Sequence, residues 1–317
     1  MGPDRPIGSR YAVMLRTHVW DDFVARQYDR LVAKTGDGQV FVLLDETNGR
    51  VEVDRDNVVR YTQGDLLALG LAKAGPGNLL WYNGDYSLYV FLDRYPDFDY
   101  YIMVEYDVTV NVALDDVVAK ARREGIGFIG LSKDVEPIPE WSFTETCLDA
   151  YSMEQVQKRL ICLAVFSAAA ARQLFDRRLE LSRAHARGGM RRWPYCEAYI
   201  PTELGVSGFK MAELTEFGRA DHYDWLPAIA ENDINLLRDQ AFVHPVLDSE
   251  RYVAHTMKDT WPPESFFYPR SATRRRLTRV SPRFYGPVLA RALRERIASA
   301  FRNHVLGRLP GLSASRR

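Results

Sequence analysis

Short apolar runs alternate with segments of helical spacing through roughly the first 130 residues. The apolar runs are rich in β-branched and aromatic residues and are bounded by turn residues, which is typical of buried strands. The segments between them repeat their apolar positions every three to four residues and carry caps and stops, as helices do. The predicted strands are 11–18, 40–47, 57–62, 98–111 and 126–131, and the predicted helices are 21–36, 64–75, 83–96 and 114–125.

This alternation predicts an α/β fold with a doubly wound, mainly parallel sheet. In such sheets ligands bind at the carboxyl ends of the strands. Three predicted strands end in polar residues, and we expect these residues to line one crevice. They are Arg16-Thr17-His18, Asp45-Glu46 and Glu105-Tyr106-Asp107.

The second half of the chain is less regular. Residues 164–167 read as a strand and 168–186 as a strong helix, whereas 193–204 and 240–248 are short motifs in loop-rich surroundings. The segment 281–307 predicts a closing helix with an apolar stripe and a basic remainder. The stripe consists of Leu289, Leu293, Ile297, Phe301 and Val305, and the basic residues are Arg291, Arg294, Arg296 and Arg302.

The predicted domains follow from these patterns. Residues 1–269 form one domain with a first half at about 10–135 and a second half at 136–269, followed by a basic extension at 270–317. The chain has 317 residues, of which 46% are hydrophobic, which is enough for one large core or two smaller ones. The three cysteines have no metal-like spacing and read as buried thiols of a reducing cytosol.

The formal net charge is zero, but it is distributed unevenly. Residues 270–317 contain thirteen arginines and one acidic residue, so this tail carries a charge of +12 and the body −12. The tail either meets an anionic surface such as a membrane or folds back on the acidic body. We expect no signal peptide and no membrane-spanning segment, and therefore a cytoplasmic protein that is peripheral at the inner face of the membrane if the tail binds lipid. We expect no nucleic-acid partner, because the tail has few aromatic residues and the body is acidic.

The most informative chemistry is the acid pair Glu105 and Asp107, at the end of a strand that otherwise reads as buried. Buried carboxylates are usually paired or bind a metal. The sequence contains no glycine-rich dinucleotide motif and no phosphate-binding loop, and 74–78 reads as a turn. Two neighbouring carboxylates can hold a hard divalent cation, which would stabilise a diphosphate leaving group.

The early α/β alternation and the acid-x-acid motif resemble the GT-A fold of nucleotide-sugar glycosyltransferases, with Glu105 in place of the usual first Asp. Residues 81–108 also resemble a poorly characterised group of bacterial and fungal glycosyltransferase-like proteins, which have a Trp-x-x-x-(Asp/Glu)-Tyr block before a Pro-x-(Phe/Tyr)-Asp strand. The resemblance implies an enzyme that moves a hexosyl or related group from a nucleotide-sugar donor to a glycan or lipid-linked acceptor in polysaccharide biosynthesis. It implies Mn²⁺ or Mg²⁺ as the cofactor. It makes 1–269 a catalytic domain with a donor half at about 10–135 and an acceptor half at 136–269. An unpaired candidate base favours inversion.

The resemblance also implies roles for individual residues. Glu105 and Asp107 would contact the metal and the diphosphate, and a late histidine, His244, would complete the metal site. The donor would be contacted by further residues, namely Arg16, Thr17, Asp45, Glu46, Asn83 and Asp85. Glu197 would be the catalytic base, with Glu203 as the second choice.

Each of these assignments has a structural alternative. The acid pair would otherwise form salt bridges, His244 would be a core histidine (with His255 competing for the ligand role), and Glu197 would pair with Arg191 or Arg192. Two other functions also stay open. One is a metal-dependent nucleotidyltransferase or hydrolase on a similar scaffold, and the other is a non-catalytic protein that binds glycans or nucleotides.

Overall fold

The computed structural model describes residues 10–132 and 137–305. The chain divides into two compact units. Unit 1 runs to Tyr223 and includes Asp239–Val243, and unit 2 comprises Asp224–Arg238 and the chain from His244 onwards. This division differs from the predicted one at 269 and 270, because residues from His244 to 269 pack with the C-terminal helices.

Unit 1 is built on a seven-stranded sheet with the order β3-β2-β1-β4-β7-β6-β8. β7 is antiparallel to both of its neighbours, and the other pairs are parallel. The prediction of an α/β fold with a mainly parallel, doubly wound sheet is therefore confirmed. The strands are β1 (Tyr11–Thr17), β2 (Gln39–Asp45), β3 (Val58–Tyr61), β4 (Tyr100–Glu105), β6 (Phe128–Leu131), β7 (Leu160–Ser167) and β8 (Met211–Glu213).

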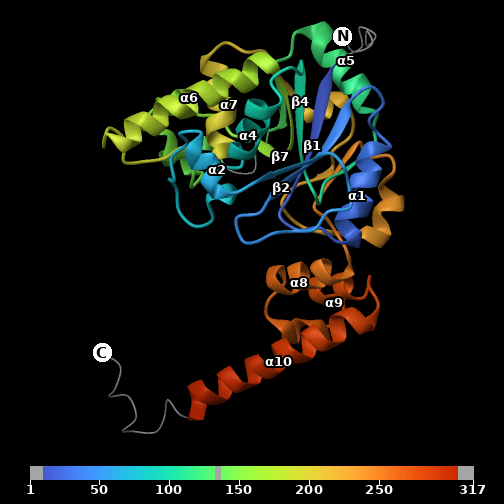
Figure 1. Ribbon diagram of the computed structural model, residues 1–317. Helices are drawn as coiled ribbons and strands as arrows, with labels where there is room; N and C mark the ends of the chain where they lie inside the picture. Colours follow the sequence, from blue (N-terminus) through green and yellow to red (C-terminus); the bar gives the residue numbers. More distant parts are fainter. Residues whose placement is uncertain (1–9, 133–136, 306–317) are drawn as a thin grey trace. The chain divides into compact units, whose positions relative to one another are not determined.

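Helices cover both faces of this sheet (Figure 1). One face packs against α1 (Asp22–Val32) and α5 (Leu114–Glu124). The other packs against a second group of helices. They are α2 (Gln63–Ala68), α3 (Leu79–Tyr82), α4 (Tyr86–Arg94), α6 (Ala168–Ala186) and α7 (Cys196–Val206). Successive side chains of β1 alternate between the two faces, as the pleat of a strand requires.

Local sequence signals place several of these elements. Asp21 caps α1 by accepting hydrogen bonds from the amides of Phe23 and Val24, and Gly125 ends α5 in the left-handed conformation. The segment 193–204 differs from its prediction, because most of it forms helix α7 despite Pro201. α7 is almost fully buried, so packing outweighs the loss of one backbone hydrogen bond.

The remaining elements of unit 1 are short. They are β5 (Thr109–Val110), β9 (His222–Tyr223), β11 (Phe242–His244), which ends on the first residue of unit 2's second segment, and the 3₁₀ turns η1 (Ile138–Glu140), η2 (Thr144–Cys147), η3 (Met153–Gln155) and η4 (Leu214–Phe217). β5 pairs with Phe242 and Val243 of β11.

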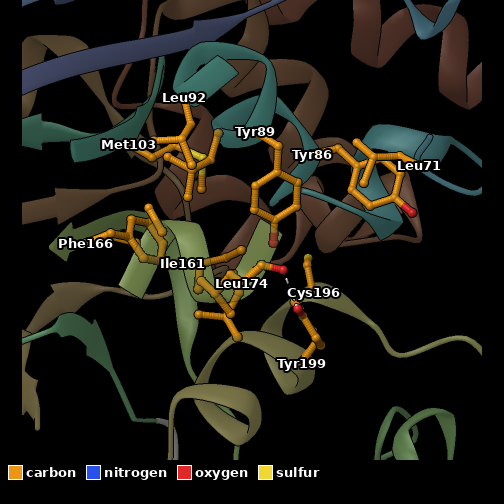
Figure 2. Packing of buried hydrophobic residues seen from close by; sticks show 14 of the residues in the cluster. Leu71, Tyr86, Tyr89, Leu92, Met103, Ile161, Phe166, Leu174, Cys196 and Tyr199 are labelled. Carbon is orange, nitrogen blue, oxygen red and sulfur yellow. Dashed lines mark hydrogen bonds between the residues drawn. The ribbon is translucent and has the colours of Figure 1, made fainter. Parts of the chain in front are cut away.

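A buried ion pair joins α4 to α6 in the core of unit 1. Arg178 donates to both carboxylate oxygens of Asp85 at 2.7 and 3.2 Å, and neither side chain is exposed. Tyr89 also donates to Asp85 at 2.7 Å, and the Arg178 guanidinium lies 3.7 Å from the ring centre of Tyr199. Figure 2 shows Tyr89 and Tyr199 among the packed apolar side chains of this core. Breaking such a pair leaves an uncompensated charge in the core.

Unit 2 is mainly helical. It contains β10 (Ile229–Ala230), which pairs with β12 (Val246–Leu247), and the elements η5 (Glu231–Leu237), α8 (Ser249–Asp259), η6 (Pro263–Phe267), α9 (Ala272–Leu277) and α10 (Pro282–Val305). Its core lies between α8, α9 and the first half of α10, where Tyr252, Leu277 and Leu289 are buried together. Across the described residues of both units, none of the helices combines the length and the apolar character needed to span a bilayer.

Asp85→Asn is expected to lower the free energy of unfolding by about 3–5 kcal/mol, because Arg178 then stays buried without its counter-charge. Urea unfolding measures the loss. Glu180→Gln, which removes the exposed partner of Arg177, is the matched control and is expected to cost less than about 1 kcal/mol. Equal effects of the two substitutions would contradict this account of the core.

Candidate functional site

The strand order of the sheet reverses between β1 and β4. β2 and β3 lie on one side of β1, and β4 lies on the other. Ligands of doubly wound sheets bind at the carboxyl ends of the strands at this point. Arg16 of β1 and Glu105 of β4 face each other in register there. The predicted convergence of strand-end polar residues therefore holds for these two strands.

The guanidinium of Arg16 connects three parts of unit 1. Its Nη1 donates to the carbonyl oxygen of Gly84 at 2.6 Å, and its Nη2 forms an ion pair with Glu105. Burial lowers the pKa of Arg16, but the charge of Glu105 and the smaller contributions of Tyr61, Cys196 and Cys162 together keep the pKa above its ordinary value. Both side chains are partly exposed, so the pair borders solvent rather than the closed core.

Gly84 allows this close approach. A Cβ at position 84 would lie 2.8 Å from Nη1 of Arg16, so any other residue would displace the guanidinium. The neighbours of Gly84 are fixed in the core. Asp85 pairs with Arg178, and Asn83 accepts from the indole of Trp193 at 2.7 Å and donates to the carbonyl of Ala74 at 2.9 Å. The turn 83–85 is therefore a rigid support for Arg16.

The chain turns immediately after Glu105. The amide of Val108 donates to the carbonyl of Glu105 at 3.0 Å, which places Asp107 in the turn instead of on a continuing strand. Asp107 is partly buried there. A carboxylate oxygen of Glu105 lies within 4.8 Å of Sγ of Cys162. Burial raises the pKa of Cys162 well above its ordinary value, and the charges of Glu105, Glu197 and Asp107 raise it further.

Glu197 reaches the same place from the first turn of α7. Burial raises the pKa of Glu197 to about 8, with a further contribution from the charge of Glu105, although the backbone amide of Ile161, the Arg16 charge and the Tyr195 side chain each lower it. The residue is half-buried. The structure thus brings the predicted base next to the predicted acid pair, and it does not pair Glu197 with Arg191 or Arg192, whose amides bind Asp149 instead.

Carboxyl groups from three segments meet Arg16 at this point. Three carboxyl groups from β4, the following turn and α7 lie around Cys162, and Arg16 acts on Glu105, Glu197 and Cys162. Burial is the largest cause of the raised pKa of Glu197, and the repulsion from Glu105 adds to it. We call Arg16, Glu105, Asp107 and Glu197 the switch-point cluster.

The switch-point cluster fits a hard divalent cation in charge and in ligand type. Glu105 and Asp107 offer carboxylate oxygens, which Mg²⁺ and Mn²⁺ prefer. Burial and the neighbouring carboxylates favour the protonated thiol of Cys162 in the absence of a cation. Arg16 already engages one oxygen of Glu105, so a cation bound here would share Glu105 with the guanidinium.

A separate cavity of about 260 Å³ opens at the end of β2. It is lined by Asp45, Asn48, Gln63, Lys73 and Asn78 with their neighbours, and none of the switch-point cluster lines it. Asp45 also accepts from the amide of Thr47 at 2.9 Å. The segment 74–78, predicted as a turn, has positive φ angles at Gly75 and Gly77 and forms one wall.

The other predicted donor contacts have partners within the fold. Thr17 donates to the carbonyl of Val19 at 2.7 Å and closes the turn after β1. Glu46 accepts from the amide of Val51, which lowers its pKa, and from Arg60. Asn83 and Asp85 are fully buried in the network described above. Direct contacts from these residues to a donor stay predictions.

Two further predicted residues have hydrogen-bond partners within the fold. Glu203 is buried and accepts from Tyr151, Gln173 and Ser207 at 2.8, 2.8 and 2.9 Å, which is typical of a structural carboxylate. His244 belongs to unit 2, where its Nδ1 lies 2.6 Å from the carbonyl oxygen of Asp224. The roles of Glu203 as a base and of His244 as a metal ligand stay predictions.

Sequence reasoning missed three residues that shape the site: Gly84, Cys162 and Arg178. Gly84 could have been noticed, because it separates two polar residues in the Asn-Gly-Asp block at a predicted helix start. The sequence did not indicate that Arg178 pairs with Asp85, because the two residues are 93 positions apart and Arg178 is one of several arginines in its helix. Cys162 read as an ordinary buried thiol, and only the pairing of β4 with β7 brings it to Glu105.

No protein-family model and no curated protein sequence matches the chain. Among solved structures, the apo form of the bifunctional glycosyltransferase WbbM is similar over 77% of this chain and 46% of its own, with 10% identity and a TM-score of 0.41. The apo form of mouse xyloside xylosyltransferase 1 is similar over 75% of this chain and 97% of its own, with 9% identity and a TM-score of 0.39. The chain thus spans about half of the length of the WbbM structure, and similarity this low does not determine an activity.

The raised pKa of Glu197 predicts a pH-dependent stability. The pKa of Glu197 is about 8 in the folded protein and 4.5 when the residue is free in water. Between these two pH values the unfolded state loses the proton more readily than the folded state. The folded state therefore becomes less stable as the pH rises through this range. The wild type should therefore lose stability relative to Glu197→Gln from about pH 5 to pH 8. Urea unfolding of both proteins across this range tests it, with the exposed Glu180→Gln as control. Parallel curves for the wild type and Glu197→Gln would exclude the raised pKa.

Proposed function

We propose that this protein is a glycosyltransferase that moves a sugar from a nucleotide-sugar donor to a hydroxyl group of a glycan or lipid-linked acceptor. The observation that carries the proposal is the switch-point cluster, in which carboxyl groups from β4, its turn and α7 meet Arg16 at the reversal of the strand order. A sheet of this kind binds its ligand at that point. The clustered acids supply both ligands for a cation and a general base.

The donor's two ends fit two neighbouring places along one edge of the sheet. The cavity at the end of β2 offers polar groups, including Asp45, Asn48 and Gln63, to a nucleoside. The diphosphate would then extend towards β1 and β4, since the carboxyl ends of parallel strands meet at the same edge. Arg16 provides a fixed positive charge for the departing phosphate.

Glu105 and Asp107 would hold Mn²⁺ or Mg²⁺. When bound, the ion supplies charge that stabilises the nucleoside diphosphate as a leaving group. The chain's own residues complete the chemistry. The rigid 83–85 turn keeps Arg16 and Glu105 in position, and the carboxylate form of Glu197 accepts the proton of the acceptor hydroxyl as its oxygen bonds to the anomeric carbon. A single base of this kind suits a one-step displacement with inversion.

Asp107→Asn is expected to abolish the release of nucleoside diphosphate from the donor while leaving the urea unfolding curve unchanged, because Asp107 lies in a turn rather than in the core. A panel of UDP-, GDP- and CMP-sugars with Mn²⁺, screened first by thermal shift, identifies the donor. The exposed Asp93→Asn is the matched control. Full activity of Asp107→Asn would refute the proposal. Pyrophosphate or a nucleoside monophosphate as the product of a diphosphate donor would indicate a nucleotidyltransferase or hydrolase.

Glu197→Gln is expected to lower kcat by about 10²–10⁴-fold with little change in the KM for the donor, because it removes a proton acceptor and keeps the shape of the side chain. The rising limb of the wild-type pH profile should disappear with it. Steady-state kinetics across pH measure both effects, and Glu180→Gln serves as the control. A variant that keeps this limb and its kcat would show that Glu197 is not the base.

A further inference from the structure

The apolar stripe of α10 is only half covered. Leu289 is buried in the core of unit 2, and Leu293 packs against the same cluster. One and two turns further on, Ile297 and Phe301 are 68% and 61% exposed. The four residues lie on one side of the helix, because they are spaced four apart. The same stripe that closes the core of unit 2 therefore continues into solvent.

Residues of η6 contact α10 as far along the helix as Arg296. Phe266 contacts Tyr285 of α10 at a ring separation of 5.6 Å, and Glu264 pairs with Arg296 at 3.2 Å. Ile297 follows directly after this ion pair. Figure 1 shows the last turns of α10 extending past α8 and α9. A helix end that needed only to close the core could have ended at this position.

The charge of this region is strongly positive. Several arginines of α9 and α10 are neutralised within unit 2, where Arg276 pairs with Asp259, Arg279 with Asp233 and Arg296 with Glu264. Arg291 and Arg294 are exposed and form no ion pair among the residues that the structure describes. Arg294 lies one turn before Ile297 and borders the stripe on the helix surface.

Exposed aromatic residues accompany the stripe. Trp261, Phe267 and Tyr268, which lie in or beside η6, are all more than half exposed. Aromatic residues of this kind are enriched where proteins meet the interface of a bilayer. The region thus combines exposed apolar side chains, exposed arginines and interfacial aromatic residues.

We propose that the uncovered end of α10 binds the surface of an anionic lipid bilayer, with Ile297 and Phe301 entering the interface and Arg291 and Arg294 contacting lipid phosphates. A helix with an apolar stripe and a basic flank binds in this way, and the anionic lipids contribute the electrostatic part of the affinity. The inference does not depend on the proposed function, because it concerns unit 2 alone.

Charge selects this partner over two others. A second copy that docked through the same end of α10 would bring like-charged arginines together across the interface, which costs free energy. A nucleic acid would satisfy the arginines and leave Ile297 and Phe301 in water. An anionic bilayer satisfies both the apolar and the basic side chains.

The test is co-sedimentation of the full chain with vesicles. We expect binding to equimolar phosphatidylglycerol and phosphatidylcholine, none to phosphatidylcholine alone, and weaker binding as salt is added. The double variant Ile297→Ser/Phe301→Ser and the double variant Arg291→Glu/Arg294→Glu should each bind at least about tenfold more weakly. These side chains lie outside the core, so the unfolding temperature should not change.

Matched controls come from unit 1. Leu67→Ser and Arg123→Glu change exposed residues of the same kinds and should bind vesicles as the wild type does. Wild-type protein that ignores anionic vesicles, or binds neutral ones equally well, would overturn the proposal. So would double variants that bind like the wild type, a dimer that Ile297→Ser/Phe301→Ser converts to monomer without altering vesicle binding, or RNA binding that only the arginine variant loses.

Discussion

The contact between Arg16 and Glu105 determines the geometry of the candidate site. It joins β1 and β4, between which the strand order of the sheet reverses. The carbonyl oxygen of Gly84 accepts a second hydrogen bond from Arg16 and fixes its guanidinium. That carbonyl is fixed because its neighbours are anchored in the core, Asp85 by Arg178 and Asn83 by Trp193. A buried ion pair between two helices thus determines where a partly exposed ion pair lies. This arrangement also explains the use of glycine at residue 84, since a Cβ there would lie 2.8 Å from Nη1 of Arg16 and the guanidinium would have to shift.

The strands and their polar ends could be predicted from the sequence, because both are local properties. A buried strand is visible as an apolar run, and the doubly wound pattern places the ends of such runs at one edge. Partners could not be predicted, because they depend on which distant segments meet. Asp85 read as a donor contact, and only its distant partner Arg178 shows that it belongs to the core. The pairing of Glu105 with Arg16 was anticipated only as a generic salt bridge.

Helix α7 and helix α10 illustrate two other reasons for failure. Pro201 argues against a helix at α7, because a proline inside a helix removes a backbone hydrogen bond. The packing of α7 against its neighbours compensates for this loss. In α10 the periodicity was correct, but periodicity identifies an apolar side without telling what covers it. Leu289 and Ile297 have the same place in the repeat and opposite environments. Which residues of the stripe are buried depends on how far η6 extends along α10, and the local sequence of α10 does not predict this.

The charge of the switch-point cluster offers a physical reason for control over the reaction. Burial, with a further contribution from the charge of Glu105, raises the pKa of Glu197 to about 8 and favours its protonated form near neutral pH. A protonated Glu197 cannot accept a proton, so water near the donor is not activated. Additional positive charge beside Glu105 opposes the contribution of that carboxylate and lowers the pKa of Glu197. Under the proposed function, neutralising Glu105 makes the base more available, which couples proton removal to loading of the site.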